Sequence, residues 1–259
     1  MINIIIILFI LILINSYVKD NFANITYANS INSNIVHIFW TGGFDSTFRI
    51  CELLYSGKIV QPIYIVNKNI DGFDFLGFPI TRKSVDFEIK TMDHIRKKLN
   101  NNNLLPTLYI NDIKQDKEYY TAMRNIYYER YGLFAPILNQ PLGRFSRPSN
   151  QYTLLALFAK NYPHTIEICV EKCGTGLDTH TEKYRTGIGG DCRLKENIPN
   201  DLNIFNKFRF PIIHLTKKDM LKIAKKKGFD NILKMTWSCW FPVNGKQCGY
   251  CDMCRHRVI

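Results

Sequence analysis

From residue 35 onward, the chain alternates short apolar runs with longer amphipathic stretches. A short apolar run bounded by turn residues predicts a strand, and apolar residues at three- and four-residue spacing predict a helix. Strands that alternate with helices are typical of an α/β fold, a parallel sheet covered by helices on both faces. We predict strands over residues 35–40, 60–66, 108–113 and 165–170, and helices over residues 48–55, 82–99, 117–131, 150–161 and 216–227.

Two segments do not follow this alternation. Residues 174–199 contain glycines, threonines and charges without a sustained period, which predicts a long loop of the kind that covers active sites. Residues 4–14 are an unbroken apolar run, too short for an ordinary membrane span of about 20 residues. The run looks like the core of a signal peptide, but no Lys or Arg precedes it and the cleavage pattern after it is poor.

The corner between the first strand and the first helix carries the segment Thr41-Gly42-Gly43-Phe44-Asp45-Ser46. Adjacent glycines allow consecutive backbone N–H groups to point into one concavity at a helix N-terminus, where anions bind. The Asp45 carboxylate is suited to hold Mg²⁺. A plain glycine turn with a Ser or Asp helix cap is the alternative. The phosphate-loop pattern of kinases and GTPases is absent from the sequence.

The residues that we expect to bind a nucleotide at this corner provide glycine backbone, hydroxyl groups and one carboxylate. They are Thr41, Gly42, Gly43, Phe44, Asp45, Ser46 and Thr47.

Four cysteines lie near the end of the chain, at Cys239, Cys248, Cys251 and Cys254. Two-residue gaps allow thiolates to face one centre, so this spacing predicts a closed tetrahedral Zn²⁺ site with a structural role. An iron–sulfur cluster uses the same ligands, and disulfides are a further alternative that such close spacing disfavours. The remaining cysteines show no ligand spacing and are most simply small buried apolar residues; they are Cys51, Cys169, Cys173 and Cys192.

Composition limits the class of protein. The 259 residues are 46% hydrophobic and 22% charged, which is enough to bury a full core and excludes a disordered chain. The net charge of +12 suggests a polyanionic partner such as ATP, tRNA or another nucleic acid. The chain is also rich in Ile, Asn and Lys, and this bias raises the lysine content without any binding role, so the charge carries little weight.

The motifs at the two ends together resemble the PP-loop ATP pyrophosphatase superfamily, and within it they are most similar to the 7-cyano-7-deazaguanine synthase family. The resemblance covers most of residues 35–257. It rests on Thr41–Ser46, which is similar to the pattern S-G-G-x-D-S with threonine in the first place, and on the T-W-S-C segment 236–239 followed by residues 248–255. Weaker support comes from Asn150, from the P-x-x-x-L-T-K run 211–217 and from Asp191-Cys192-Arg193.

This resemblance implies an adenine nucleotide alpha hydrolase-like, Rossmann-like sheet and an enzyme of queuosine biosynthesis that uses ATP, Mg²⁺ and Zn²⁺. It implies that a ligase converts 7-carboxy-7-deazaguanine and ammonia to 7-cyano-7-deazaguanine through an adenylated intermediate. Asp45 and Ser46 would be catalytic, and Arg193 would bind the substrate carboxylate, unless Arg193 only forms a surface salt bridge. Residues 67–84 lack the Gln-Arg-His-like segment of the family, and the loop before Asp191 lacks its aromatic-glycine-tyrosine segment, so the acceptor stays open.

Two rival functions remain at this point, a tRNA- or DNA-modifying PP-loop enzyme and a catalytically silent nucleotide- or nucleic-acid-binding homologue. A nucleic-acid partner and a homodimer are left open with them. We expect three parts in the chain, an apolar N-terminal segment and linker over residues 1–34, a nucleotide-binding domain over 35–235 and a zinc-binding segment over 236–259. We expect the protein to be cytoplasmic, with residues 4–14 as a signal, a weak membrane anchor or neither.

Overall fold

The computed structural model of this chain describes a large part of the sequence beyond residue 34. The chain divides into two compact units, Met1–Ile35 and Val36–Ile259, and the site discussed below lies wholly within the second. The described residues are 35–66, 72–73, 79–80, 83–111, 113, 116–119, 121–122, 125, 150–172, 177–255 and 257–258.

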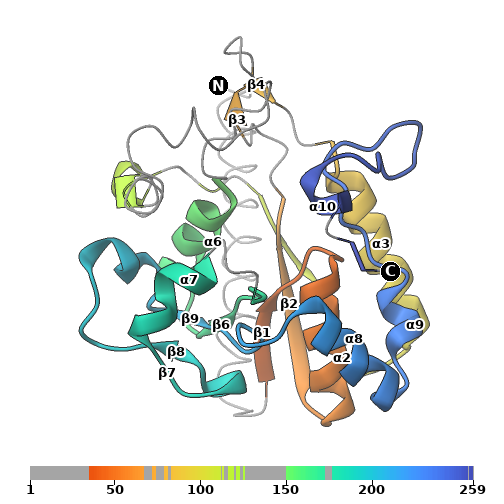
Figure 1. Ribbon diagram of the computed structural model, residues 1–259, viewed down its shortest axis with the longest axis horizontal. Coiled ribbons are helices and arrows are strands. Elements are labelled where there is room, and N and C mark those ends of the chain that lie inside the picture. The colour runs from red at the N-terminus through yellow and green to blue at the C-terminus, as the bar shows by residue number, and fades with distance from the viewer. Residues whose placement is uncertain are drawn as a thin grey trace, which may run out of the picture. The chain divides into compact units, whose positions relative to one another are not determined.

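The described residues form strands and helices in alternation, as Figure 1 shows. The strands are β1 Ile35–Phe39, β2 Ile59–Ile65, β3 Gly72–Phe73, β4 Pro79–Ile80, β5 Leu108–Ile110, β6 Ile166–Glu167, β7 Arg185–Thr186, β8 Arg193–Leu194 and β9 Phe208–Arg209. The α-helices are α2 Phe44–Tyr55, α3 Val85–Leu99, α6 Asn150–Asn161, α7 Leu177–Thr181, α8 Lys217–Lys227, α9 Asp230–Leu233 and α10 Asp252–Arg255. The 3-10 helices are η2 Glu182–Tyr184, η3 Gly189–Asp191 and η4 Asn200–Phe205.

Seven of these strands form one sheet in the order β5-β2-β1-β6-β9-β8-β7. The pairs β2–β5, β1–β6 and β6–β9 are parallel. The pairs β8–β9 and β7–β8 are antiparallel, so one edge departs from the predicted parallel arrangement. Strands β3 and β4 pair with each other in a separate two-stranded sheet. The predicted α/β class is confirmed, with a sheet that is mostly parallel.

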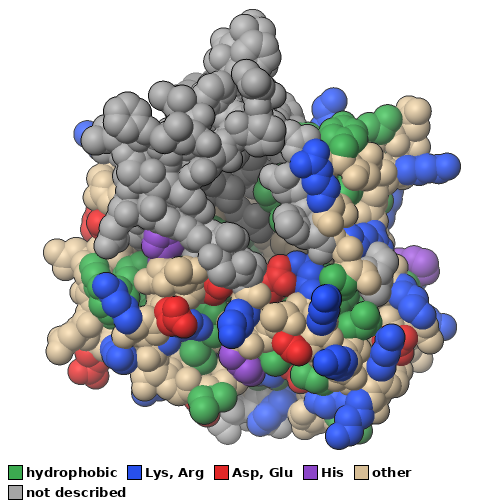
Figure 2. All heavy atoms as spheres, in the orientation of Figure 1, with side chains coloured by type: hydrophobic (Ala, Val, Ile, Leu, Met, Phe, Trp, Pro, Cys, Tyr) green, Lys and Arg blue, Asp and Glu red, His purple; other side chains and the backbone are tan. Residues whose placement is uncertain are grey.

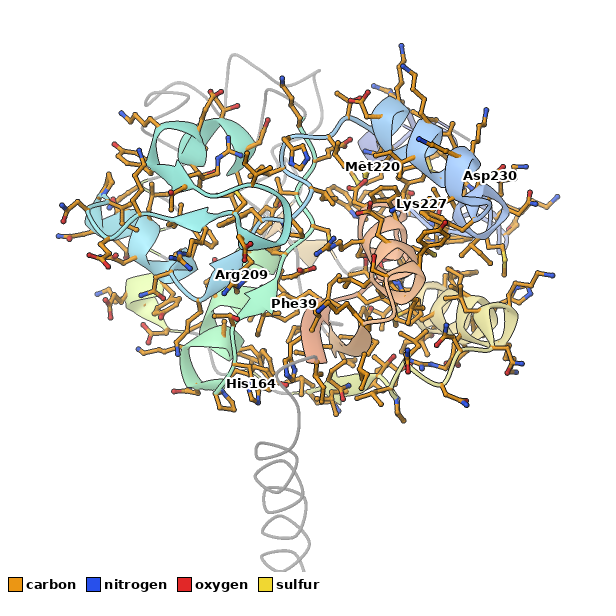
Figure 3. All side chains as sticks on the ribbon, turned by 90° about the horizontal axis from the view of Figure 1, so that it is seen from below. Phe39, His164, Arg209, Met220, Lys227 and Asp230 are labelled. Carbon is orange, nitrogen blue, oxygen red and sulfur yellow. The ribbon has the colours of Figure 1, made fainter. Side chains whose placement is uncertain are left out.

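Helices cover both faces of the sheet, and each face has its own hydrophobic cluster. The alternation of side chains along β1 sends Ile38 and Trp40 to one cluster and Phe39 to the other. The first cluster also takes the apolar side chains of α2, α3, α8 and α9, whereas the second takes those of α6 and η4. In Figure 3, Met220 on α8 and Phe39 on β1 mark these two clusters.

The predicted elements are largely present, but their ends differ. Helix α2 begins at Phe44 rather than at residue 48, because Gly43 occupies the N-cap position and residues 44–47 form the first helical turn. Helix α8 begins at a capping box, in which Thr216 and Asp219 bond reciprocally, and ends before Gly228 in the left-handed conformation. Lys218, Lys222, Lys225 and Lys226 of α8 are exposed, whereas Lys217 is half-buried. Figure 2 shows many Lys and Arg side chains on one face of the molecule.

One predicted segment is wrong, and another lies mostly outside the described residues. The long loop predicted over 174–199 is wrong, because the chain there forms α7, η2, β7, η3 and β8 from residue 177 onward. Elements of two to five residues are too short to give a hydrophobic period. Most of the helix predicted over 117–131 lies outside the described residues, as do residues 1–34. Among the residues that are described, no helix has both the length and the apolar character that a membrane span requires.

Candidate active site and metal centre

The site begins at the corner where β1 passes into α2. Gly42 has φ +69°, in the left-handed region that glycine favours. A Cβ at this position would lie 3.2 Å from the carbonyl oxygen of Glu88 and 3.2 Å from Cγ2 of Thr91. Gly43 is the N-cap of α2, so the N–H groups of the first turn are directed outward from the positive end of the helix. The corner is thus shaped for a close approach of an anion to the backbone.

The predicted nucleotide-binding residues divide into two groups. Thr41, Gly43, Phe44, Asp45 and Ser46 all line one cavity of about 380 Å³, a volume within the usual range for small-molecule sites. Gly42 and Thr47 are not among its lining residues. Thr47 is fully buried, and its hydroxyl accepts a hydrogen bond from the Trp40 indole N–H at 3.0 Å, so the threonine holds the helix against β1.

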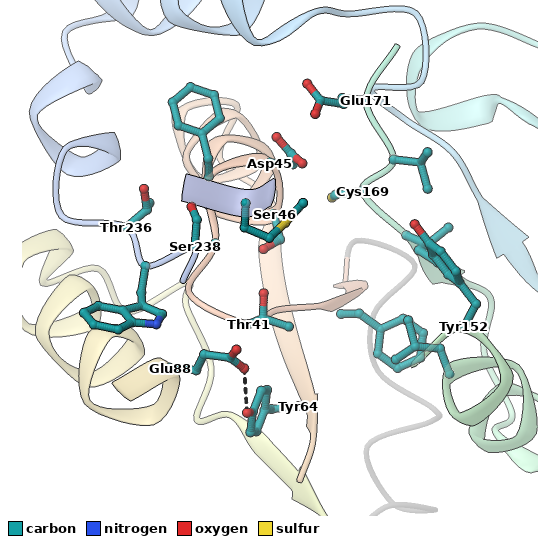
Figure 4. Close-up of a pocket in the computed structure, with 18 of the residues that line it drawn as sticks. Thr41, Asp45, Ser46, Tyr64, Glu88, Tyr152, Cys169, Glu171, Thr236 and Ser238 are labelled. Atoms are coloured by element: carbon teal, nitrogen blue, oxygen red, sulfur yellow. Dashed lines mark hydrogen bonds between the residues drawn. The ribbon is translucent and has the colours of Figure 1, made fainter. Parts of the chain in front are cut away.

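A charged cluster lies beside this corner. Lys217 at the start of α8 forms an ion pair with Glu171, and its Nζ is 3.9 Å from Oδ1 of Asp45. Figure 4 shows Asp45, Glu171 and Cys169 together on one side of the cavity. Among the described residues, Oδ1 of Asp45 is buried without a hydrogen-bond partner. Burial and then the negative charge of Glu171 raise the pKa of Asp45 to about 7, although Lys217 opposes them. Such an acceptor is suited to a cation.

The thiol of Cys169 also faces this cavity. Burial raises its pKa well above the ordinary value, and the nearby carboxylate of Glu167 raises it further. The neutral thiol is therefore the stable form of Cys169, which disfavours a nucleophilic role.

The C-terminal segment forms another wall of the same cavity. The backbone N–H of Trp237 donates to the carbonyl oxygen of Gly42 at 3.0 Å, which joins this segment directly to the glycine corner. The Trp237 ring stacks on Phe87 of α3 at a centroid distance of 4.7 Å, and its indole N–H donates to the carbonyl of Cys239 at 2.7 Å. The lining residues from this segment are Thr236, Trp237, Ser238, Trp240, Met253, Arg257 and Val258.

The remaining walls come from the sheet and from α6 and α3. Apolar side chains of β1, β2 and α6 and of the segment after β6 supply most of them, including Ile63 and Leu155. The buried carboxylate of Glu88 lies among them and accepts hydrogen bonds from Tyr64 at 2.7 Å and from Ser84 at 2.8 Å. Figure 4 shows the bond between Tyr64 and Glu88. A cavity of this kind can enclose a largely apolar ring while a charged group lies at the glycine corner.

The four cysteines predicted to bind a metal are brought together. The sulfur atoms of Cys239, Cys248, Cys251 and Cys254 all lie within 4.8 Å of one another. The distance between the sulfurs of Cys248 and Cys254 is 3.9 Å. Zn–S bonds of about 2.3 Å in a tetrahedron place sulfurs about 3.8 Å apart, so this arrangement fits zinc.

Backbone N–H groups support the thiolate form of these ligands. The N–H of Cys248 donates to the sulfur of Cys239 at 3.2 Å, and the N–H of Cys251 donates to the sulfur of Cys248 at 3.3 Å. Burial opposes ionisation of Cys248, but the donors from Cys251 and Tyr250 outweigh it and lower the pKa of Cys248 to about 7. The described cysteines are all free thiols, which gives no support to a disulfide; Cys173 lies outside the described residues.

Arg193 lies apart from the cavity. It is exposed on β8, where it pairs with Thr186 of β7 and with Arg209 of β9, and it is not among the described residues that line the cavity. The strand order explains this position, because β9 separates β8 from β6. The contact between Arg193 and a substrate carboxylate therefore stays a prediction, and this arrangement does not favour it.

Comparison with known proteins identifies a family model and several relatives that match part of this chain. The family model described as "Queuosine biosynthesis protein QueC" matches residues 200–258. This chain is similar to 7-cyano-7-deazaguanine synthases. The 7-cyano-7-deazaguanine synthase of Leptospira biflexa is 40% identical over 99 residues, 38% of this chain and 34% of the relative. That of Rhizorhabdus wittichii is 46% identical over 48 residues, 18% of this chain and 20% of the relative.

The match spans about a third or less of the length of these curated 7-cyano-7-deazaguanine synthases. The QueC family match includes Lys217, Trp237 and the four cysteines, but not the glycine corner at Gly42. In the sequence, Lys217 is part of the P-x-x-x-L-T-K run 211–217, and no local pattern marks Glu171. The available signal for Glu171 was its place after β6, because ligands of such sheets bind beyond the carboxyl ends of the strands.

Proposed function

We propose that this protein is an ATP-dependent ligase that converts 7-carboxy-7-deazaguanine and ammonia to 7-cyano-7-deazaguanine. The similarity of this chain to 7-cyano-7-deazaguanine synthases supports the acceptor and the reaction type. The glycine corner at the end of β1 supports the use of a nucleotide, because it offers helix N–H groups to phosphate.

One observation carries this proposal. The hydrogen bond from Trp237 N–H to the Gly42 carbonyl joins the T-W-S-C segment to the glycine corner, and both then line one cavity. The part of the chain that the QueC family model matches, residues 200–258, thus shares its cavity with the part that is shaped for phosphate. A nucleotide and an acceptor in this cavity would lie next to each other, as adenylation requires.

The corner would bind the phosphates of ATP through the first turn of α2 and the hydroxyl of Ser46, which lines the cavity. Lys217 supplies a positive charge at the same place. These groups are suited to balance the charge that develops as pyrophosphate leaves.

Mg²⁺ would be held by Asp45 and Glu171. The fit rests on the buried Oδ1 of Asp45, which has no hydrogen-bond partner among the described residues, and on the hard oxygen ligands that both carboxylates offer. When bound, the ion would neutralise phosphate charge. Lys217 now lies between the two carboxylates, so its ammonium group marks a place where a cation is favourable.

The reaction consumes two molecules of ATP. The substrate carboxylate attacks the α-phosphorus and releases pyrophosphate, and ammonia then displaces AMP to give the amide. Adenylation of the amide oxygen with loss of a second pyrophosphate, followed by loss of AMP, leaves the nitrile. The apolar lining from β2, α6 and the segment after β6 would keep water away from the adenylates.

Zinc would be held by Cys239, Cys248, Cys251 and Cys254, whose sulfurs are grouped for tetrahedral binding. Four protein ligands leave no open coordination position, so the metal would organise the cavity wall and take no part in the chemistry.

The experiment is to measure AMP and pyrophosphate release from ATP with ammonia and 7-carboxy-7-deazaguanine, with tRNA or DNA, or with no acceptor. Release that depends on the deazaguanine, together with formation of the nitrile, supports the proposal. Release that only tRNA or DNA stimulates would replace it with a nucleic-acid-modifying enzyme. No release under any condition, despite binding of ATP, would indicate a silent homologue.

A further inference from the structure

The described lining of the cavity contains two cationic side chains, Lys217 and Arg257. They come from different walls. Lys217 is at the start of α8 and interacts with the carboxylates of Asp45 and Glu171 beside the glycine corner. Arg257 belongs to the C-terminal segment, three positions after Cys254. An anionic acceptor that enters beside ATP therefore meets Arg257 as the positive charge of the C-terminal wall.

The cysteine cluster determines where Arg257 lies. The backbone N–H of Arg257 donates to the carbonyl oxygen of Cys254 at 3.3 Å, and its guanidinium Nη2 donates to the carbonyl oxygen of Lys234 at 3.4 Å. Cys251 directly precedes the short helix α10, and Cys254 lies within it. Metal binding to these thiolates would fix the backbone that leads to Arg257.

The neighbours of Arg257 in this wall suit a flat heteroaromatic ring. Trp237, Trp240 and Met253 supply aromatic and polarizable surface, and the stacking of Trp237 on Phe87 holds the Trp237 ring in one orientation. A guanidinium group binds a carboxylate through two parallel hydrogen bonds, which fixes the plane of the acid as well as its position. The wall thus combines surface for a ring with a fork for its carboxylate.

We infer that Arg257 binds the carboxylate of the acceptor, the role that the sequence assigned to Arg193, and that the cysteine cluster positions it. This inference rests on the proposed function. The phosphates have their own partners at the glycine corner, in the first turn of α2 and in Lys217. Arg257 would hold the acid beside the α-phosphorus and would release the nitrile, which has no negative charge.

The test compares Arg257→Ala, Arg257→Lys and Arg193→Ala with wild-type protein. Lys246→Ala is the matched control, because Lys246 is an exposed cation of the same segment and does not line the cavity. Each variant is first shown to retain the zinc content of wild type. Steady-state AMP release then gives KM for the carboxylate and KM for ATP, and calorimetry measures binding of 7-carboxy-7-deazaguanine and of its nitrile product without ATP.

In Arg257→Ala we expect KM for the carboxylate to rise by about 10-fold or more, because hydrogen bonds to a charged group are lost. We expect KM for ATP and the affinity for the nitrile to change by less than about 3-fold. Arg257→Lys restores part of the affinity, since it keeps the charge but not the fork. Arg193→Ala and Lys246→Ala match wild type.

Three results would overturn the inference. If KM for ATP rises more than KM for the carboxylate, Arg257 binds the phosphates instead. If Arg257→Ala loses as much affinity for the nitrile as for the carboxylate, Arg257 only packs against the ring. An effect of Arg193→Ala in place of Arg257→Ala would restore the role predicted from the sequence. If wild-type protein binds the carboxylate without turnover, the proposed function fails while calorimetry still decides the role of Arg257. If wild-type protein does not bind the carboxylate, both fail.

Discussion

The substitution Asp45→Asn should stabilise the ligand-free protein while it abolishes catalysis. Burial raises the pKa of Asp45 from 3.8 to about 7, which corresponds to about 4 kcal/mol of destabilisation of the ionised form at pH 8. The side chain keeps 27% of its surface exposed, so we reduce the expected gain to about 2–3 kcal/mol. Asparagine has nearly the same shape and carries no charge to bury.

The direction in which stability changes with pH follows from the state, folded or unfolded, that holds the proton on Asp45. Between pH 3.8 and about 7 the folded protein holds a proton on Asp45 that the unfolded chain has released. Stability from this group is therefore present below pH 3.8 and is lost as the pH rises through 7. The advantage of Asp45→Asn should be largest at pH 8 and should fall to about 1 kcal/mol at pH 5.

The assay is urea unfolding of both proteins at pH 5 and pH 8, with and without Mg²⁺ and ATP. Asp191→Asn is the control, because Asp191 is 89% exposed and its ion pair with Arg209 should contribute little. Mg²⁺ and ATP should stabilise wild type and fail to stabilise Asp45→Asn, since Asp45 would hold the ion. If Asp45→Asn unfolds at pH 8 at the same urea concentration as wild type or at a lower one, the ionised Asp45 carboxylate does not destabilise the folded protein.

Three further predictions concern other parts of the molecule. Ser46→Ala should lower AMP release by roughly 10–100-fold with unchanged circular dichroism, because one hydrogen bond to a charged phosphate is lost; near-normal turnover would remove Ser46 from the site. Purified protein should be colourless with one zinc per chain, whereas visible absorption would indicate an iron–sulfur cluster. Cys251→Ser should lose the metal and expose the C-terminal segment to protease. Burial and then His164 lower the pKa of His37 to about 4. The stability that the neutral ring contributes should therefore be lost as the pH falls from about 6.5 through 4, by about 2 kcal/mol after allowance for the partial exposure of the ring. If the unfolding free energy of His37→Phe keeps this pH dependence, His37 is not its source.

Local patterns in the sequence were enough to predict the two ends of the site. Adjacent glycines between a strand and a helix have few other uses, and the corner at Gly42 has the left-handed conformation that only glycine adopts easily. The cysteine spacing likewise predicts the arrangement of the ligands, because two-residue gaps allow the sulfurs to face one metal ion. Both features depend on residues that are near one another in the chain.

The charged cluster could not be predicted in this way. Asp45, Glu171 and Lys217 come from α2, from the segment after β6 and from the start of α8, and only the strand order brings them together. In the sequence, Lys217 belongs to a helix start, where Thr216 and Asp219 explain the pattern without any ligand. Arg193 shows the converse, because a motif residue lies on β8, where the sheet carries it away from the cavity.

A metal held by the four cysteines would have a structural purpose even though it would touch no reacting atom. The C-terminal segment that lines the cavity contains one regular element, the four-residue helix α10, among its described residues. So short a stretch buries too little apolar surface to offset its conformational entropy, whereas binding of a structural zinc contributes about 10 kcal/mol or more. The hydrogen bond from the Trp237 N–H to the Gly42 carbonyl oxygen connects this segment to the glycine corner. Removal of the metal should therefore weaken binding of the acceptor at Arg257 before it weakens binding of phosphate, because α2 and its N-terminal turn do not depend on the cysteines.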